Sequence, residues 1–379
     1  MHYFEYATKD TTLYEASGSM NTGLDEILEI RKDMNADGSV IKVSRALIQF
    51  DLTYISKSVA TGLITSSSIW PKYYLNLYDA NSDSLNVTQS LYAYPVSQSW
   101  VNGSGKVGSN PIIEDGASWK WKDNGTLRSQ WHARADTTAV SESGGSWYSG
   151  STYEASQSFT YEPADLRMDV THIVNKWLGK NVPNEGFMIK RSGSIGNTNS
   201  NLDEGNTTQY GNFKFFGRET HTIYQPKLEV VWDDSKWTTG SLSALSNTAI
   251  EDMVLYMRGL RPKYKENSKI KFRVVGRERY PEKTYSTSGY STGYTTAKTL
   301  PSGSTYYQIK DAYTEEVIVP FGSGSKVSCD STGNYFNLWM NGLQSERFYR
   351  IEYKIVSGSG TADETIQFFD EKHSFKVVR

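Results

Sequence analysis

Three oxygen-bearing side chains at alternate positions form the clearest candidate for a chemical site in the sequence. Asp33, Asn35 and Asp37 precede Gly38 with the spacing D-x-N-x-D-G, in which carboxylate and amide oxygens can surround a hard cation such as calcium. An EF-hand loop needs a bidentate Glu at its twelfth position, where this sequence has Ser44. A hairpin turn explains the same residues, because Asp-Gly favours a tight bend between two strands. We therefore expect a turn, with a calcium site as the alternative.

A second candidate is a group of aromatic side chains in an otherwise polar stretch. It consists of Trp119, Trp121, Trp131, Trp147 and Tyr148. Planar rings on loops can stack against sugar rings. They can equally anchor a long loop on its own domain, or become buried against another chain. Packing or partner contact is the preferred interpretation, and glycan contact is the alternative.

A third candidate is a strand with one basic face. Lys269, Lys271 and Arg273 alternate with apolar residues, and residues 258–283 hold ten Lys and Arg against three Glu. A groove for nucleic acid would place aromatic residues among the exposed cations, whereas the interleaved residues here are apolar and should face a core. We expect a solvated face, or a surface that docks an acidic partner such as a neighbouring copy of the chain, and no nucleic acid.

Sequence signatures of catalysis are missing. There is no H-E-x-x-H metal motif, no G-x-S-x-G turn and no G-x-x-x-x-G-K-[ST] phosphate loop. The sequence therefore predicts a protein that is not an enzyme and needs no cofactor, apart from the calcium alternative.

Composition excludes several classes of protein. The chain has 379 residues, of which 13% are aromatic, and a formal net charge of −2, which argues against a disordered chain. No run of 18 apolar residues exists, so no membrane partner is expected. Cys329 is the single cysteine, and the first residues lack the cationic and apolar regions of a signal peptide. We expect folding in a reducing cytoplasm.

The elements that position these residues are predicted to be strands. Short apolar or alternating runs separated by Gly, Ser, Asn and Asp clusters are typical of antiparallel sandwiches. Such runs occupy residues 28–31, 41–43, 47–52, 74–78, 227–232, 269–275, 317–319 and 349–355. Helical spacing occurs in one segment, residues 164–178, with Asp169 or Thr171 as its cap and Gly179 after its end. The predicted fold class is all-β with two domains.

A domain boundary is expected after residue 235. Residues 1–235 hold 20 Lys and Arg against 27 Asp and Glu, a net charge of −7, whereas residues 236–379 hold 20 against 15, a net charge of +5. The opposite signs indicate two differently built domains.

The first half resembles the DNRLRE-type β-sandwich, a module of bacterial surface proteins, carbohydrate-active proteins and phage virion proteins. The resemblance spans about residues 8–233 and rests on the segments 12–14, 21–23, 28–30, 44–52, 75–78, 92–96, 168–177, 184–189, 215–219 and 225–230, together with Trp100. An aromatic-rich insertion near residues 101–160 departs from the usual pattern. The resemblance implies a jelly-roll-like sandwich with one short helix over residues 1–235.

The second half, residues 236–379, resembles an Ig-like β-sandwich carried by virion proteins of tailed phages. The similar segments are 272–281, 307–312 and 328–336. Together the two resemblances imply a structural virion protein of a neck, tail, baseplate or fibre attachment. Its partners would be other virion proteins, copies of itself and, in the alternative, a host surface glycan. A carbohydrate-binding adhesin is the second hypothesis and a glycan-degrading enzyme the third, since a fold does not fix a function.

Overall fold

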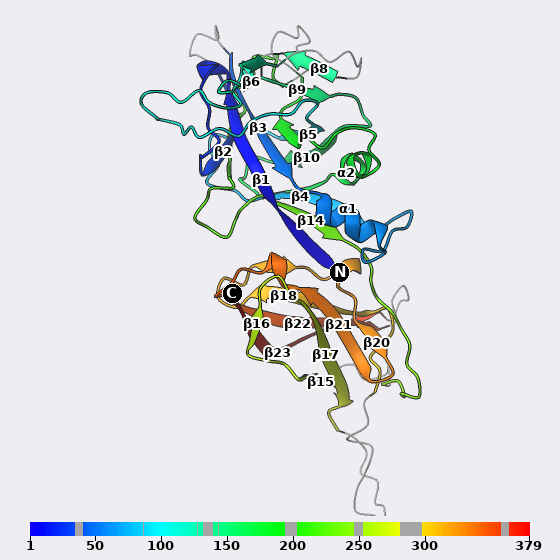
Figure 1. Ribbon diagram of the computed structural model, residues 1–379. Helices are drawn as coiled ribbons and strands as arrows, with labels where there is room; N and C mark the ends of the chain where they lie inside the picture. The colour runs from blue at the N-terminus through cyan, green and yellow to red at the C-terminus, as the bar shows by residue number, and fades with distance from the viewer. Residues whose placement is uncertain are drawn as a thin grey trace, which may run out of the picture. The chain divides into compact units, whose positions relative to one another are not determined.

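The computed structural model describes residues 1–34, 41–85, 87–126, 128–131, 139–142, 144–193, 203–245, 253–280, 298–357 and 364–379. Strands hold 46% of the chain and helices 8%, which confirms an all-β protein of more than one sandwich. The chain forms two compact units (Figure 1). The N-terminal unit comprises Glu5–Thr61 and Lys72–Val230, and the C-terminal unit comprises Met1–Phe4, Gly62–Pro71 and Val231–Arg379.

The N-terminal unit is built on ten connected strands. Eight follow one another in the order β10-β5-β12-β3-β1-β14-β4-β11, and β2 pairs with both β3 and β13. Their bounds are β1 (His2–Tyr14), β2 (Ile27–Met34), β3 (Ile41–Phe50), β4 (Lys72–Leu77), β5 (Gln89–Pro95), β10 (Ala155–Phe159), β11 (Leu166–Asp169), β12 (Phe187–Lys190), β13 (Gly211–Phe216) and β14 (Lys227–Val231). Two small hairpins join β6 (Trp121–Asp123) to β7 (Ser129–Gln130) and β8 (Ala139–Glu142) to β9 (Gly145–Tyr148).

The core of the N-terminal unit contains the apolar residues that the strand pattern indicates. Six apolar residues of the predicted strands and of the predicted helix are all buried: Phe50, Leu75, Leu77, Val170, Trp177 and Val230. Phe187 on β12 joins two of them, because its ring centroid lies 6.2 Å from that of Phe50 and 4.6 Å from that of Trp177. Aromatic rings at these separations pack favourably.

The predicted helix over residues 164–178 is shorter than expected. Its first part forms β11, in which Leu166 and Met168 are buried in alternation and pair with β4, while α2 covers Thr171–Leu178. The prediction of Asp169 or Thr171 as the cap is wrong, because the N-cap residue is Val170, whose side chain accepts no hydrogen bond; Asp169, one residue earlier, accepts the backbone N–H of Thr171 at 3.0 Å. Gly179 ends the helix with φ −75°, and the left-handed residue is Lys180 with φ +58°. The chain reversal therefore falls one residue later than expected.

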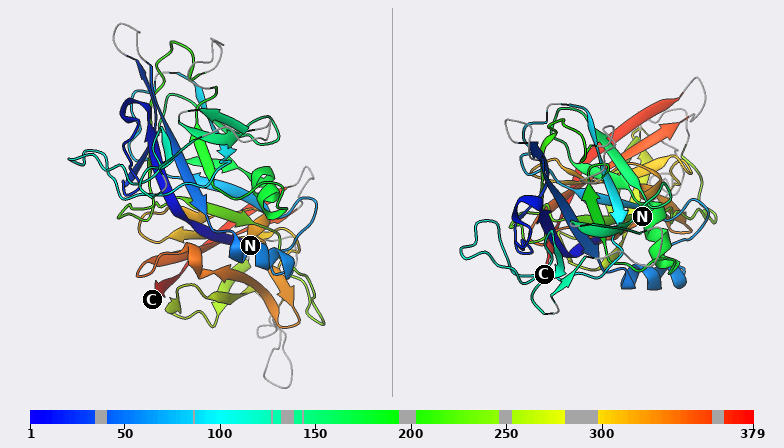
Figure 2. Two further views of the ribbon diagram at one scale, coloured as in Figure 1. Left: turned by 45° about the horizontal axis from the view of Figure 1, so that its top comes forward. Right: turned by 90° about the horizontal axis from the view of Figure 1, so that it is seen from above.

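A second helix, α1 (Thr53–Ala60), is absent from the sequence prediction. Only Ile55 and Ser58 are buried among its eight residues, so its apolar stripe is too short to show a helical period. Asp51 accepts the backbone N–H of Thr53 at 2.9 Å and its hydroxyl at 2.6 Å, which stabilises the first turn. The helices α1 and α2 lie side by side (Figure 2) and together line a cleft. No helix in the described part of the chain is long and apolar enough to cross a membrane.

The C-terminal unit is a sandwich of two sheets. One sheet has the order β15-β17-β21-β20 and the other the order β16-β23-β22-β18-β19. The bounds are β15 (Met253–Arg258), β16 (Lys263–Lys265), β17 (Lys269–Glu278), β18 (Thr305–Asp311), β19 (Val317–Val319), β20 (Ser328–Asp330), β21 (Gly333–Trp339), β22 (Phe348–Ser357) and β23 (Thr365–Val378). Phe336 on β21 stacks on Tyr307 on β18 with ring centroids 4.1 Å apart, so the two sheets face each other across one core. This unit has short 3-10 turns at Ser323–Ser325 and Met340–Gly342, and the N-terminal unit has one at Glu15–Ser17.

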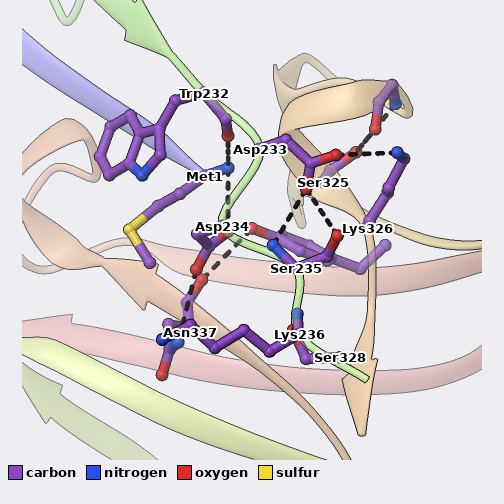
Figure 3. A network of polar contacts seen from close by, with 12 residues as sticks. Met1, Trp232, Asp233, Asp234, Ser235, Lys236, Ser325, Lys326, Ser328 and Asn337 are labelled. Carbon is purple, nitrogen blue, oxygen red and sulfur yellow. Dashed lines mark hydrogen bonds and ion pairs between the residues drawn. The ribbon is translucent and has the colours of Figure 1, made fainter. Parts of the chain in front are cut away.

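The boundary between the units corrects the predicted division at residue 235. Figure 3 shows why the chain from Trp232 onward belongs to the C-terminal unit. The Trp232 N–H donates to the Met1 carbonyl at 3.0 Å, and the Met1 amine pairs with Asp234 at 3.2 Å. Asp233 pairs with Lys326 at 2.8 Å. These contacts tie Met1 and residues 232–234 to the C-terminal sandwich, so the boundary lies between Val230 and Val231.

Candidate contact surfaces

The aromatic residues of the insertion form a buried cluster in the N-terminal unit. Trp119, Trp131, Trp147 and Tyr148 are at most 7% exposed. The three tryptophans pack with Leu47 and Met188 of β3 and β12. This burial corrects the predicted contact surface, because a ring inside a core cannot stack on a sugar or on another chain. The packing alternative is the one observed.

Trp121 and Trp131 illustrate how the insertion is held. Trp121 lies on β6 and is half-buried, so it keeps some accessible surface. The indole N–H of Trp131 donates to the Ser118 carbonyl at 2.9 Å. The insertion is therefore held by hydrogen bonds and by a hydrophobic cluster that it shares with β3 and β12, as long loops need.

A buried ion pair lies within the same cluster. The Arg45 guanidinium sits 4.8 Å from the ring of Trp119 and 4.9 Å from that of Trp147. Its Nε and Nη2 donate to the two carboxylate oxygens of Glu204 at 3.1 and 2.6 Å. Lys190 adds a second cation 3.2 Å from Glu204. All three charged side chains are at most 1% exposed, so this arrangement serves packing rather than chemistry on a ligand.

Two further cations extend the cluster. Arg191 donates to the carbonyl of Ile30 at 2.8 Å and to Gln89, and burial lowers its pKa to about 10. Lys32 donates to the carbonyl of Asn206 at 2.8 Å, and burial, followed by the charge of Arg191, lowers the pKa of its ammonium to about 8. Backbone carbonyl and side-chain amide oxygens thus accept hydrogen bonds from these two cations.

A buried carboxyl group on β1 has a strongly shifted pKa. Asp10 is 1% exposed and accepts the backbone N–H of Arg218 at 2.5 Å. Burial is the main cause that raises its pKa from 3.8 to about 7, and the nearby carboxylates of Glu219 and Asp25 raise it further. The backbone N–H and the charge of Arg218 act in the opposite direction. Folding therefore favours the protonated form of this group.

We expect the contribution of Asp10 to stability to fall as the pH rises from about 4 to about 7, because the folded state binds the Asp10 proton more tightly than the unfolded state does. A pKa change of this size corresponds to about 4 kcal/mol as an upper bound. Asp10→Asn should be more stable than the wild type at pH 8, with little difference at pH 4, in urea titrations at both values. Asp51→Asn is the control, since hydrogen bonds from Thr53 lower the pKa of Asp51. Equal pH slopes for the wild type and Asp10→Asn would contradict the assignment.

The predicted calcium loop connects two paired strands. Asp33 on β2 lies opposite Lys42 on β3 in an antiparallel register, as a hairpin requires. Its carboxylate pairs with Arg31. Asn35 and Asp37 lie outside the described residues. Within the described ranges, no group of three or more His, Cys, Asp and Glu side chains is arranged to hold a metal.

We expect the melting temperature to be the same in millimolar calcium and in EDTA, because a hairpin turn needs no cation. Differential scanning fluorimetry of the wild type and of Asp37→Ala tests this. A rise in calcium that Asp37→Ala abolishes would show a cation site, since a ligand that binds only the folded state raises its stability.

The basic strand keeps its cations on the outer face of the four-stranded sheet. Lys269 and Lys271 are exposed and Arg273 is half-buried, whereas the alternate residues Phe272 and Val274 are buried. The predicted alternation is therefore confirmed, and the cations of β17 occupy one face of the sheet.

Contacts across the sheet order this basic face. Arg273 donates through both terminal nitrogens to Asp330 at 2.9 Å, and these hydrogen bonds hold the pKa of that carboxyl well below its usual range. The Lys271 ammonium lies 3.9 Å from the ring of Tyr335, and that of Lys269 lies 5.3 Å from the ring of Trp339. Aromatic rings from β21 thus lie among the cations. The expectation that the exposed cations have no aromatic neighbours is therefore wrong, because it considered only the residues of the strand itself. Exposed ammonium groups held in fixed positions form a surface that can dock an acidic partner.

Comparison with known proteins identifies no family for this chain. No protein-family model matches the chain, and no curated protein matches it. Among solved structures, a DUF4785 family protein from Legionella pneumophila is similar at 9% sequence identity with a TM-score of 0.19. That alignment covers all of this chain and 64% of the Legionella protein. A likeness this weak supports no argument about function.

Sequence reasoning missed two features, a buried ion pair and a group of exposed aromatic residues. Glu204 lies in a polar stretch with no strand or helix period, and no local signal links it to Arg45, 159 residues earlier. The exposed aromatic residues on the outer face of the five-stranded sheet, described below, lie in strands whose alternation could have identified them. Phe368 directly precedes the buried Phe369 on β23, and such neighbours must point to opposite faces.

Proposed function

We propose that this protein is a non-enzymatic structural component of a tailed-phage virion, part of a neck, tail, baseplate or fibre attachment. In this role it presents surfaces that bind other virion proteins and neighbouring copies of the chain. Support comes from the resemblance of both halves to virion modules and from the sandwich architecture, which holds surface residues on rigid strands. The protein would fold in the host cytoplasm and be incorporated into the virion there.

The observation that carries the proposal is the basic face of β17. Lys269 and Lys271 are exposed, and each ammonium lies near an aromatic ring of β21. Trp, Tyr and Arg supply much of the binding energy at protein interfaces, and Trp339, Tyr335 and Arg273 lie beside these lysines. Opposite charges in the two halves of the sequence, −7 in residues 1–235 and +5 in residues 236–379, fit contacts between copies.

The carbohydrate-binding alternative loses its main support. The aromatic group on which it rested is largely buried, since Trp119, Trp131 and Trp147 belong to the core. Trp121 alone keeps some accessible surface among the four tryptophans of that group. We therefore retain one proposed function.

Assembly experiments test the proposal. Mass spectrometry of purified virions should detect the chain, and Lys269→Glu with Lys271→Glu should reduce its incorporation while the purified variant stays folded. Lys57→Glu with Lys180→Glu, two exposed lysines of the N-terminal unit, is the matched control and should incorporate normally. Absence of the chain from virions, or turnover of a polysaccharide by the purified protein, would overturn the proposal.

A further inference from the structure

An exposed aromatic patch covers one end of the outer face of the five-stranded sheet. Phe368 on β23 is 62% exposed and Ile366 is 47% exposed. We define the aromatic patch as Tyr306, Phe321, Lys354, Ile366 and Phe368. Large apolar side chains gathered at one place on a surface indicate an interaction site.

Strand register brings the members of the patch together. Lys354 on β22 lies opposite Tyr306 on β18 and opposite Phe368 on β23, in one row across three strands. The ring of Phe321 lies 5.8 Å from that of Phe368. The Lys354 ammonium lies 5.0 Å from the ring of Tyr306 and 5.5 Å from that of Phe321. The Lys354 ammonium thus lies near two aromatic rings, and the ring of Phe368 packs beside one of them, that of Phe321.

The charge of Lys354 is not matched by a carboxylate in the described part of the chain. Other cations on the same sheet face have such partners. Arg350 pairs with Glu315 at 2.5 Å and with Glu352 at 3.1 Å, and Lys310 pairs with Glu352 at 2.9 Å. The aromatic patch therefore combines apolar surface with one free positive charge, and its complement is an apolar surface that carries carboxylates.

The N-terminal unit has a surface of that kind. A cleft of about 320 Å³ is lined by Tyr14, Asp25, Glu26, Ile27, Glu29, Lys106 and Val107. We call it the acidic cleft. Val107 is 54% exposed, and Glu26 is exposed as well. The carboxylate of Asp25 accepts the N–H of Val107 at 3.1 Å, and Glu29 accepts the Tyr14 hydroxyl at 2.9 Å, so both carboxylates are fixed at the cleft.

We propose that the aromatic patch of one copy binds the acidic cleft of a second copy of this chain. The inference rests on the proposed function, because it names one contact through which copies assemble. A patch and a cleft on different parts of the surface give a head-to-tail contact, which builds a ring or a filament. Two aromatic patches facing each other would instead place one Lys354 ammonium against another, and like charges at an interface are unfavourable.

Self-association of the full chain tests the inference. Sedimentation velocity over a range of protein concentrations should show association that weakens as salt is added, since salt screens exposed charges. Phe368→Ser and Lys354→Glu should each weaken association about tenfold or more. Tyr280→Ser is the matched control, because Tyr280 is 77% exposed and lies outside the patch, and it should have no effect.

A charge swap identifies the partner surface. Glu26→Lys alone should weaken association as Lys354→Glu does, and the two variants mixed together should associate again through the reversed ion pair. Cross-linking of Lys354 to acidic-cleft carboxylates in a mixture of isotopically labelled and unlabelled copies should yield mixed peptides.

Outcomes that overturn the inference differ from those that overturn the proposed function. A wild type that stays monomeric, association unaffected by Phe368→Ser, or cross-links confined to single copies would each overturn the patch-to-cleft contact. Cross-links from Lys354 to a different virion protein would overturn it too, and would leave the virion role supported. Absence from virions affects the virion role alone, since copies can still associate in solution.

Discussion

Replacing Trp177 by alanine is expected to lower the free energy of unfolding by about 3–5 kcal/mol and to abolish soluble expression. Trp177 lies on α2, is 6% exposed and packs against Phe187 on β12 with ring centroids 4.6 Å apart. Removing the ring leaves a cavity between the helix and the sheet that the short helix cannot close. Urea unfolding followed by circular dichroism measures the loss.

Trp177→Phe is the matched control. The indole N–H of Trp177 has no hydrogen-bond acceptor in the described part of the chain, so phenylalanine removes volume without breaking a hydrogen bond. We expect this variant to lose much less stability than Trp177→Ala. A loss below about 1 kcal/mol for the alanine variant would show that α2 is not packed on the sheet as described.

Replacing Glu204 by alanine is expected to cost about 3–5 kcal/mol, because it leaves two buried cations without their counter-charge. Glu204 binds both Arg45, at 2.6 Å, and Lys190, at 3.2 Å, and all three side chains are at most 1% exposed. The aromatic rings of Trp119 and Trp147 beside Arg45 exclude water from the pair. Thermal and urea unfolding should both show the loss.

An exposed ion pair gives the control for this prediction. Arg218 pairs with Glu219, and both side chains are about one third exposed, at 35% and 32%. Glu219→Gln should therefore cost less than about 1 kcal/mol. A double variant, Arg45→Met with Glu204→Met, should recover part of the loss, since it removes one of the two buried cations that need a counter-charge and leaves Lys190 as the other. Equal effects of Glu204→Ala and Glu219→Gln would contradict the buried pair.

The local pattern of the chain predicted seven of the described strands, together with the alternation on β17; the seven are β2, β3, β4, β14, β17, β19 and β22. A strand places successive side chains on opposite faces, so the period of two in residues 269–275 is sufficient to place Phe272 inward and Lys271 outward. The same pattern did not predict the helix α1, because two buried residues in eight give no period to detect.

Only the tertiary structure shows that the tryptophans of the insertion are buried and that Arg45 pairs with Glu204. The composition of the stretch around Trp119 and Trp147 fits an exposed contact surface as well as a buried cluster, and only the packing of those rings around Arg45 distinguishes the two. Glu204 reaches Arg45 across 159 residues. Local propensity and periodicity describe neighbours along the chain, whereas burial and charge pairing depend on which segments the fold brings together.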